Sequence, residues 1–300
     1  MAPLAIDWNV SPEIFGIGPV HVRYYSLLFI SGFILGYYLF TIFYKRENLP
    51  VSLLDPLLYL LMGCTLVGAR LGHVLFYEPE YYLANPAKIL AVWEGGLASH
   101  GGAIAIVLGI IWYARHYGKR YGFDFLWIMD RLGIAVAFAG MFIRLGNLMN
   151  SEIFGSPTML PWGFRFFKSP EWLALYGPGR AQSPELLQSL GLTEPLAEGL
   201  PCHPTQLYEA GSYLLIGLLL MALYKWALPR FRRGFLFGLF LTLLFGSRFL
   251  IEFIKLPQVA FEKEMSLDMG QWLSVPFIIA GLFLIIRSFR ITTPATRTQS

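Results

Sequence analysis

The stretch of the chain most suited to chemistry runs from Arg144 to Gly155 and reads RLGNLMNSEIFG. It follows an apolar run, residues 132–143, and its first nine residues contain one arginine, two asparagines and one glutamate. Arg144 and Asn147 are three residues apart and share one face of a helix. Together they offer paired donors that suit an anionic head group, because the donors of a guanidinium are planar. The alternative is an anchor, with the Arg144 side chain extended to the membrane surface.

Two further groups of polar residues adjoin apolar runs. His100 is followed by Gly101 and Gly102, and glycines allow a ligand to approach closely. A histidine there suits a general base, although a helix-end histidine bonded to a carbonyl group is the alternative. Arg248 and Glu252 are four residues apart on one helix face. They form either a stabilising ion pair or a unit in which Glu252 orients Arg248 toward a bound phosphate.

Several other residues are weaker candidates. His203 precedes an apolar run and is a second candidate base, and Gln206 shares a helix face with Glu209. Arg70 lies among small residues that favour close helix packing, so its expected role is structural. Tyr25 belongs by default to the aromatic belt of the membrane interface, although its hydroxyl is also able to bind a head group. The two cysteines show no spacing typical of a metal site.

These residues must be positioned by membrane-spanning helices. The 300 residues are 56% hydrophobic and 14% charged, whereas soluble domains carry about 25% charged residues. The apolar residues fall in blocks near the ~20 residues that cross a hydrocarbon core. The sequence therefore predicts one membrane-embedded domain, an all-α integral membrane protein with seven transmembrane helices. The predicted spans are residues 22–44, 53–77, 98–116, 124–149, 206–228, 234–254 and 270–288.

The distribution of Lys and Arg predicts the orientation of these spans. The loops on one side, together with the C-terminal tail, hold twelve of these residues, and the opposite loops hold six. The richer side is predicted to be cytoplasmic, so the N-terminus lies outside and the C-terminus inside. Residues 151–205 hold eight prolines and no run long enough to span, which predicts an outer insertion. Residues 1–20 lack a basic start and contain Asp7 and Glu13, so we expect the first span to remain uncleaved.

This orientation brings the polar residues near span ends to one level of the bilayer. The outer end of span 4 carries Arg144, and the outer end of span 6 carries Arg248 and Glu252. His100 opens span 3 and Tyr25 lies near the start of span 1. Anchoring side chains would not share one leaflet so consistently, because cytoplasmic ends accept basic anchors equally well. The sequence therefore predicts a single polar site at the outer leaflet.

At these residues the chain resembles the prolipoprotein diacylglyceryl transferase family. The most specific match is the stretch Arg144–Gly155, which resembles the family pattern Arg-x-Gly-Asn-x-x-Asn-x-Glu. The likeness runs in the same order from about Ile14 to Phe289. One departure is that Lys255 and Gln258 stand where Arg and Asp are expected, outside the core motif. The other matching pieces are Arg23-Tyr24-Tyr25, Gly68–Gly72, His100-Gly101-Gly102, His203–Glu209, Arg248 with Glu252-Phe253, and Ser266–Leu273.

The resemblance implies an enzyme of the bacterial inner membrane with a periplasmic N-terminus, a cytoplasmic C-terminus and a periplasmic head. It implies transfer of the diacylglyceryl group of phosphatidylglycerol to the lipobox cysteine of a prolipoprotein signal peptide. The products are a thioether and glycerol phosphate, and this is the first step of lipoprotein maturation. The implied partners are phosphatidylglycerol, the prolipoprotein and membrane lipid, with no nucleic acid, cofactor or metal.

The resemblance also implies roles for single residues. Arg144 and Arg248 are the expected phosphate-binding pair, and His100 is the candidate base. The base stays open between His100, His203 and a water molecule. Gln206 and Arg70 are secondary candidates. The residues expected at the phosphatidylglycerol site are Tyr25, Arg144, Asn147, Glu152, Gly155, Arg248 and Glu252.

Three other classes of protein remain as alternatives. A lipid or solute transporter usually shows paired repeats and broken helices at the midplane, and the sequence shows neither. A seven-span receptor matches the number of spans and the orientation, but does not require arginine, asparagine and glutamate at one leaflet. A phospholipase acting on the same lipid is the nearest alternative, with water in place of a thiol as the nucleophile.

Overall fold

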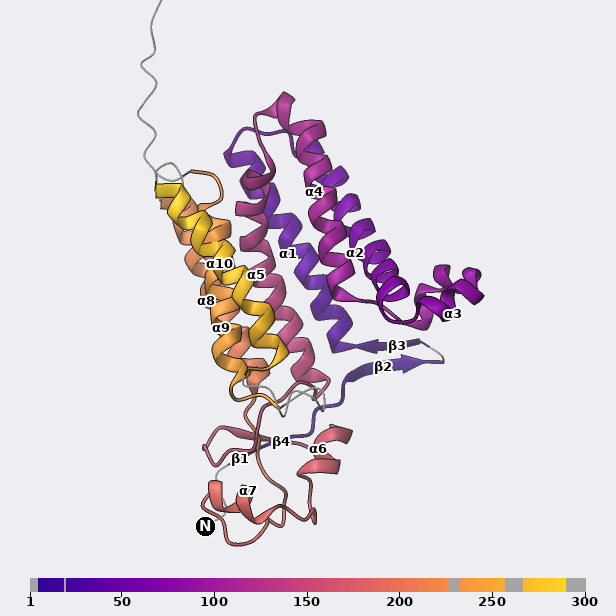
Figure 1. Cartoon of the computed structure of the whole chain (residues 1–300), viewed down its shortest axis with the longest axis vertical. Coiled ribbons are helices and arrows are strands. Elements are labelled where there is room, and N and C mark those ends of the chain that lie inside the picture. The colour runs from indigo at the N-terminus through magenta and orange to yellow at the C-terminus, as the bar shows by residue number, and fades with distance from the viewer. Residues whose placement is uncertain (1–4, 19, 227–231, 257–266, 290–300) are drawn as a thin grey trace, which may run out of the picture. The chain divides into compact units, whose positions relative to one another are not determined.

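The computed structural model describes residues 5–18, 20–226, 232–256 and 267–289 (Figure 1). The chain divides into two compact units, the first made of residues 1–36 and 132–300 and the second of residues 37–131. The described residues are mostly helical. The long helices are α1 (Tyr24–Arg46), α2 (Leu54–Phe76), α4 (Ser99–Tyr121), α5 (Phe125–Met149), α8 (Thr205–Trp226), α9 (Phe235–Glu252) and α10 (Met269–Phe289).

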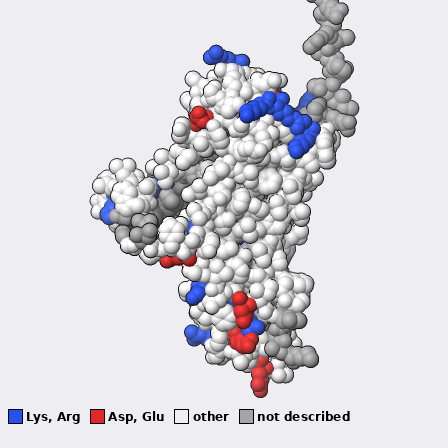
Figure 2. Space-filling model, turned by 180° about the vertical axis from the view of Figure 1, so that it is seen from behind, with Lys and Arg blue, Asp and Glu red and all other residues white. Residues whose placement is uncertain are grey.

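Six of these helices are long and apolar enough to cross a membrane, counted over the described residues. The flanks of the helices carry almost no charged side chains in the space-filling view (Figure 2). A helix satisfies its own backbone hydrogen bonds, which lipid cannot do for it. The chain is therefore a multi-pass membrane protein. α4 matches the predicted third span but is not among the six, because histidine, glycine and basic residues lower its hydropathy. The seventh span stays a prediction.

In the first unit, α9 packs against both α8 and α10 (Figure 1). α5, α8, α9 and α10 each begin within one residue of the predicted spans. The last turns of α1, α4, α8 and α10 contain Lys or Arg, which interact favourably with the negative end of a helix. A basic end on these particular helices is what the predicted orientation requires.

The 151–205 insertion, whose fold the sequence left open, contains its own small core. β1 (Ala5–Trp8) pairs in parallel with β4 (Gly163–Phe166). Two short helices follow, α6 (Pro170–Leu175) and α7 (Pro184–Ser189), each capped by a serine side chain at its start. A hairpin of β2 (Glu13–Ile17) and β3 (Val20–Arg23) leads into α1. The core side chains are Leu148, Phe154, Phe164, Phe166, Trp172 and Cys202.

The second unit is built on close contact between α2 and α4. A methyl group on Gly101 would lie 2.4 Å from the backbone oxygen of Gly68, so only glycine fits there. The glycines after His100 therefore serve helix packing, as small residues do in membrane helices. The connection from α2 to α4 contains α3 (Pro79–Ala84) and the short 3-10 helices Pro86–Leu90 and Val92–Glu94. A further 3-10 helix, Val51–Leu53, precedes α2.

Candidate active site

Arg144 lies near the C-terminal end of α5, and neighbouring side chains hold it in the interior. Its Nε is 3.0 Å from Oε2 of Glu209 on α8, and its Nη1 donates to Oδ1 of Asn147 at 3.3 Å. The Glu209 side chain is fully buried, and that of Arg144 is 13% exposed. This is not the geometry of an anchor that extends to the membrane surface. In the part of the chain that the structure describes, Nη2 of Arg144 has no hydrogen-bond partner.

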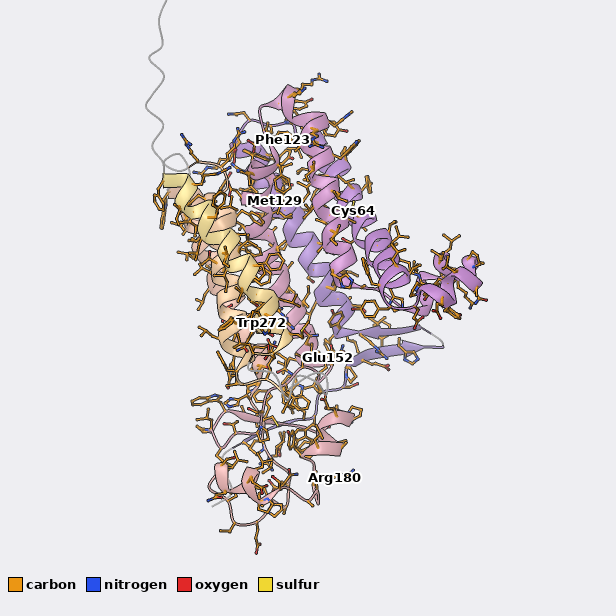
Figure 3. The ribbon with its side chains drawn as sticks, viewed as in Figure 1. Cys64, Phe123, Met129, Glu152, Arg180 and Trp272 are labelled. Atoms are coloured by element: carbon orange, nitrogen blue, oxygen red, sulfur yellow. The ribbon has the colours of Figure 1, made fainter. Side chains whose placement is uncertain are left out.

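After the end of α5 at Met149 the chain turns, and Glu152, labelled in Figure 3, follows in this turn. Glu152 Oε1 accepts hydrogen bonds from the side-chain amides of Asn147 at 2.7 Å and Asn150 at 3.2 Å. Ser151 and Ile153 adopt positive φ values of 55° and 59°. Such conformations are unfavourable for residues other than glycine and persist where surrounding contacts impose them. Both asparagines of the motif thus fix Glu152 within the turn.

The first turn of α8 completes this arrangement. Gln206 Nε2 donates to the backbone oxygen of Glu152 at 2.7 Å, and Thr205 Oγ1 donates to that of Ile153 at 2.8 Å. Gln206 and Thr205 are both fully buried. Gln206, a secondary candidate, is therefore in contact with the turn that carries Glu152. Its contacts orient the backbone of this turn.

Gly155 is where the chain leaves this turn and meets two other segments. Its N–H donates to the backbone oxygen of His203 at 2.8 Å, and it forms a backbone bridge with Lys255. A methyl group on Gly155 would lie 2.5 Å from the backbone oxygen of Ile254 and 2.7 Å from Thr205 Cγ2. The observed contacts of Gly155 are thus close backbone packing. Its expected role in binding lipid stays a prediction.

We expect Gly155→Ala to lower the free energy of unfolding by about 1–3 kcal/mol, because the added methyl group overpacks this junction. Thermal unfolding of the purified protein in detergent measures the change. Gly211→Ala is the matched control, since a methyl group on Gly211 meets no neighbouring atom within 4 Å. Equal melting temperatures for the two variants would contradict the packing role of Gly155.

Lys255, which lies outside the core motif of the sequence, belongs to this cluster. Its Nζ is 3.1 Å from Oε1 of Glu209 and 3.1 Å from Oε2 of Glu252. The Lys255 side chain is 4% exposed. Glu252 follows Arg248 on α9, and Lys255 lies just after the helix, so the chain reversal brings the ammonium back against α8. Sequence reasoning missed this contact because Glu209 is 46 residues away.

Arg248 faces the same cluster from α9. It interacts electrostatically with Glu209 and Tyr213 of α8 and with Glu252 of its own helix. Among the described residues, the ion-pair partner of Glu252 is Lys255. The sequence left open whether Glu252 pairs with Arg248 or orients it. The structure pairs Glu252 with Lys255, while Arg248 interacts electrostatically with Glu252.

Tyr25 reaches the cluster from the start of α1. A methyl group on Gly146 would lie 2.7 Å from Cδ2 of the Tyr25 ring, so the ring packs directly on the backbone of α5. Tyr25 interacts electrostatically with Glu152 and Arg144. The first unit thus brings together most of the residues expected at the site. They are Tyr25, Arg144, Asn147, Glu152, Arg248 and Glu252, with Glu209 and Lys255 added by the structure.

His203 lies beside this group and is engaged by other side chains. Its Nδ1 is 3.1 Å from the hydroxyl of Tyr208, which also accepts a hydrogen bond from Trp162 Nε1 at 2.9 Å. Burial lowers the pKa of His203 from its ordinary value. The imidazole is therefore neutral at pH 7, with one of its two nitrogens occupied.

His100 and Arg70 belong to the second unit. The His100 ring is exposed and stacks on Tyr77 with centroids 5.7 Å apart. The approach of His100 to Arg144 stays a prediction. Arg70 is 3% exposed and donates hydrogen bonds to backbone oxygens between α2 and α4. These contacts agree with the structural role expected for Arg70. The acceptors are the backbone oxygens of Lys88, Ile89, Gly95 and Gly96.

Charges in the first-unit cluster balance. Arg144, Arg248 and Lys255 supply three cations, and Glu152, Glu209 and Glu252 supply three anions. Buried charges are tolerated when each is compensated by a partner. The free donors of Arg144 remain available to an anionic group. This combination suits recognition of a phosphate by hydrogen bonds within a cluster whose charges balance.

Comparison with known proteins gives matches over nearly the whole chain. A family model described as prolipoprotein diacylglyceryl transferase matches residues 12–287. A phosphatidylglycerol–prolipoprotein diacylglyceryl transferase of Tolumonas auensis is 46% identical over 282 residues, covering 94% of this chain and 96% of the relative. A protein of the same name from Porphyromonas gingivalis is 44% identical, covering 99% of both chains. One from Chloroherpeton thalassium is 39% identical, covering 95% of both.

Proposed function

Because the chain belongs to the prolipoprotein diacylglyceryl transferase family, we propose that the cluster around Arg144 is the site of its reaction. The enzyme transfers the diacylglyceryl group of phosphatidylglycerol to a prolipoprotein, the first step of lipoprotein maturation. The observation that carries the site assignment is that Arg144 is held by Glu209 through Nε, with Nη2 left for another acceptor. Arg248, which interacts with the same carboxylate from α9, is the second cation of the phosphate site.

The acceptor is the thiol of the lipobox cysteine. Its sulfur attacks the glycerol carbon that bears the phosphate ester, and a carbon–sulfur bond forms as the carbon–oxygen bond breaks. The bonding electrons move to the phosphate oxygen, and glycerol phosphate leaves. Guanidinium groups that donate hydrogen bonds to this oxygen stabilise the developing charge. In comparable sites one such donor lowers the activation free energy by about 3 kcal/mol. The reaction draws on the phosphate ester already present in the lipid.

The thiol must lose its proton, because the thiolate is the nucleophile. His100 is our candidate for the base, as the family resemblance implies. Its exposed ring is free of ion pairs in the described part of the chain. His203 is the weaker candidate because Tyr208 occupies its Nδ1. Tyr25 and Asn147 are the proposed contacts for other oxygens of the lipid.

We further propose seven spans in the bacterial inner membrane, with α4 as the third. The N-terminus and the 151–205 insertion lie in the periplasm, and the C-terminus lies in the cytoplasm. The basic last turns of α1, α4, α8 and α10 support this orientation, because all four helices then end at the cytoplasmic face. The Arg144 cluster, near the opposite ends, then opens to the outer leaflet, where the prolipoprotein cysteine arrives.

The transfer is tested with phosphatidylglycerol labelled in its acylated glycerol, purified full-length protein and a lipobox peptide. Label on the peptide cysteine is the expected result. Release of the label as free diacylglycerol, with the peptide unmodified, would instead identify a phospholipase. A peptide with serine in place of cysteine is the control and should remain unlabelled.

No cysteine of the enzyme is needed in this mechanism. Burial raises the pKa of the Cys202 thiol, and its side chain is fully buried, so it is protonated and unreactive. We expect Cys202→Ala to keep the wild-type turnover number, while unfolding at a lower temperature because the core loses its sulfur. Loss of transfer in a variant that is still folded would contradict this and would indicate an enzyme-bound intermediate.

A further inference from the structure

One face of α8 carries three buried polar residues. Gln206, Glu209 and Tyr213 follow one another at spacings of three and four residues, which place them on the same side of a helix. Their exposed fractions are 0%, 0% and 4%. Polar residues inside a membrane helix are costly and usually serve function or specific pairing. This face of α8 is therefore expected to serve a specific pairing.

Glu209 is the central residue of this face. One carboxylate oxygen, Oε2, faces Nε of Arg144 at 3.0 Å, and the other, Oε1, faces Nζ of Lys255 at 3.1 Å. Nε is the nitrogen nearest the aliphatic stem of arginine. Within the described residues Oε2 accepts no hydrogen bond, so this contact is an ion pair that holds the guanidinium beside α8 and leaves its terminal nitrogens for other groups. One of them, Nη1, is already turned to Asn147.

We propose that Glu209 is a positioning residue that sets the orientation of the Arg144 guanidinium for diacylglyceryl transfer. The proposal rests on the proposed function, in which Arg144 stabilises the leaving phosphate. A bidentate guanidinium contact depends on the direction of its donors. A small rotation of Arg144 then weakens the contact with the leaving oxygen, although the arginine itself is still present.

Tyr213 positions the second arginine, Arg248, in the same way. Its ring packs on α5, where a methyl group on Gly140 would lie 2.9 Å from Tyr213 Cδ2. Tyr213 also interacts electrostatically with Arg248. A single face of α8 thus interacts with an arginine from α5 and an arginine from α9. The spacing between the two arginines is set by one rigid element, which suits a site that must hold both around one phosphate.

Charge balance alone is the competing explanation for Glu209. The cluster holds three cations and three anions, so removal of one carboxylate leaves an excess positive charge. The two explanations differ in what a second substitution does. Removing Lys255 together with Glu209 restores the balance of charge, but it does not restore the contact with Nε of Arg144.

The experiment compares Glu209→Gln, Glu209→Asp, Lys255→Met and the double variant Glu209→Gln/Lys255→Met as full-length purified proteins. Transfer from phosphatidylglycerol to a lipobox peptide is measured over a range of lipid concentrations. We expect Glu209→Gln to lower kcat about 100-fold, as loss of one transition-state contact does. The KM for lipid should change much less, and Glu209→Asp should recover part of the activity. The double variant should remain as slow as Glu209→Gln.

Two matched controls separate positioning from general stability. Glu47→Gln breaks another pair of a glutamate with a buried arginine, Arg131, in the second unit. Tyr224→Phe removes a buried hydroxyl from the same helix as Tyr213. We expect Tyr213→Phe, which keeps the ring, to lower kcat about tenfold. Both controls should keep the wild-type kcat at temperatures where they are folded.

Recovery of activity in the double variant would overturn the proposal and leave Glu209 as a counter-charge. A kcat for Glu209→Gln equal to that of Glu47→Gln would overturn it as well. If Glu209→Gln does not fold, the aspartate variant and Tyr213→Phe decide, since wild-type kcat in both is incompatible with positioning by α8. Failure of the wild type to label the peptide would instead refute the proposed function, because that result does not involve Glu209.

Discussion

Replacement of Arg144 by lysine is expected to lower kcat/KM for diacylglyceryl transfer by about 100-fold or more, even though the positive charge is kept. Lysine carries a point charge on a flexible stem and cannot present two parallel donors. It also cannot bind Glu209 and Asn147 and keep a further donor for a third group, whereas the guanidinium of Arg144 uses Nε and Nη1 for these two residues and keeps Nη2. The loss should appear mainly in kcat, because the charge of the leaving phosphate develops in the transition state.

The control for this variant is Arg131→Lys. Arg131 is a buried arginine of the second unit, with Nη2 close to Glu47 and its guanidinium stacked over Trp127. Its replacement should lower the unfolding temperature without a specific effect on kcat. Steady-state transfer to a lipobox peptide, normalised to the folded fraction, is the measurement. Full activity of Arg144→Lys would show that no paired guanidinium–phosphate contact exists at this position.

The local part of the site could be predicted from sequence because it depends on helix periodicity. Arg144 and Asn147 are three residues apart, and the hydrogen bond between them follows from that spacing. The same signature contains Glu152, which accepts hydrogen bonds from both asparagines. The spans could be predicted in the same way, because each is a contiguous apolar block of sufficient length. The exception is α4, where polar residues dilute the apolar signal.

Contacts between distant segments could not be predicted in the same way. Glu209 was recognised only as sharing a face with Gln206, and its two cations come from other parts of the chain. Lys255 lies after the end of α9, so no helical spacing connects it to α8. Tertiary packing decides which of several buried carboxylates meets which cation. The only signal in the sequence was a carboxylate inside an apolar helix. Such a carboxylate indicates a functional residue but does not identify its partner.

The small sheets illustrate the same limit. β1 and β4 have four residues each and pair across more than 150 positions of the chain. Strands this short carry too few residues for an alternating pattern to stand out. Parallel pairing also depends on the core that forms around it, here centred on Phe166 and Trp172. The position of the insertion could be predicted from the sequence. Its fold could not, because the fold depends on the packing of this core.

Replacement of His100 by glutamine is expected to slow transfer about 100-fold or more if His100 takes the proton of the substrate thiol. Glutamine keeps a polar side chain of similar size but cannot accept a proton. A peptide with selenocysteine in place of the lipobox cysteine supplies the decisive comparison. A selenol is more acidic than a thiol, so it is ionised without help. The defect of His100→Gln should therefore largely disappear with this peptide, as measured by label transfer from phosphatidylglycerol.

The same peptide separates the two catalytic roles. Arg144→Lys should remain slow with selenocysteine, because its defect lies in the departure of the phosphate and not in formation of the nucleophile. His203→Gln should transfer label at the wild-type rate to both peptides, because Tyr208 already occupies Nδ1 of His203. If His203→Gln is rescued by selenocysteine and His100→Gln is not, the base is His203. A base that acts directly on the thiol must be the residue whose loss the more acidic nucleophile repairs.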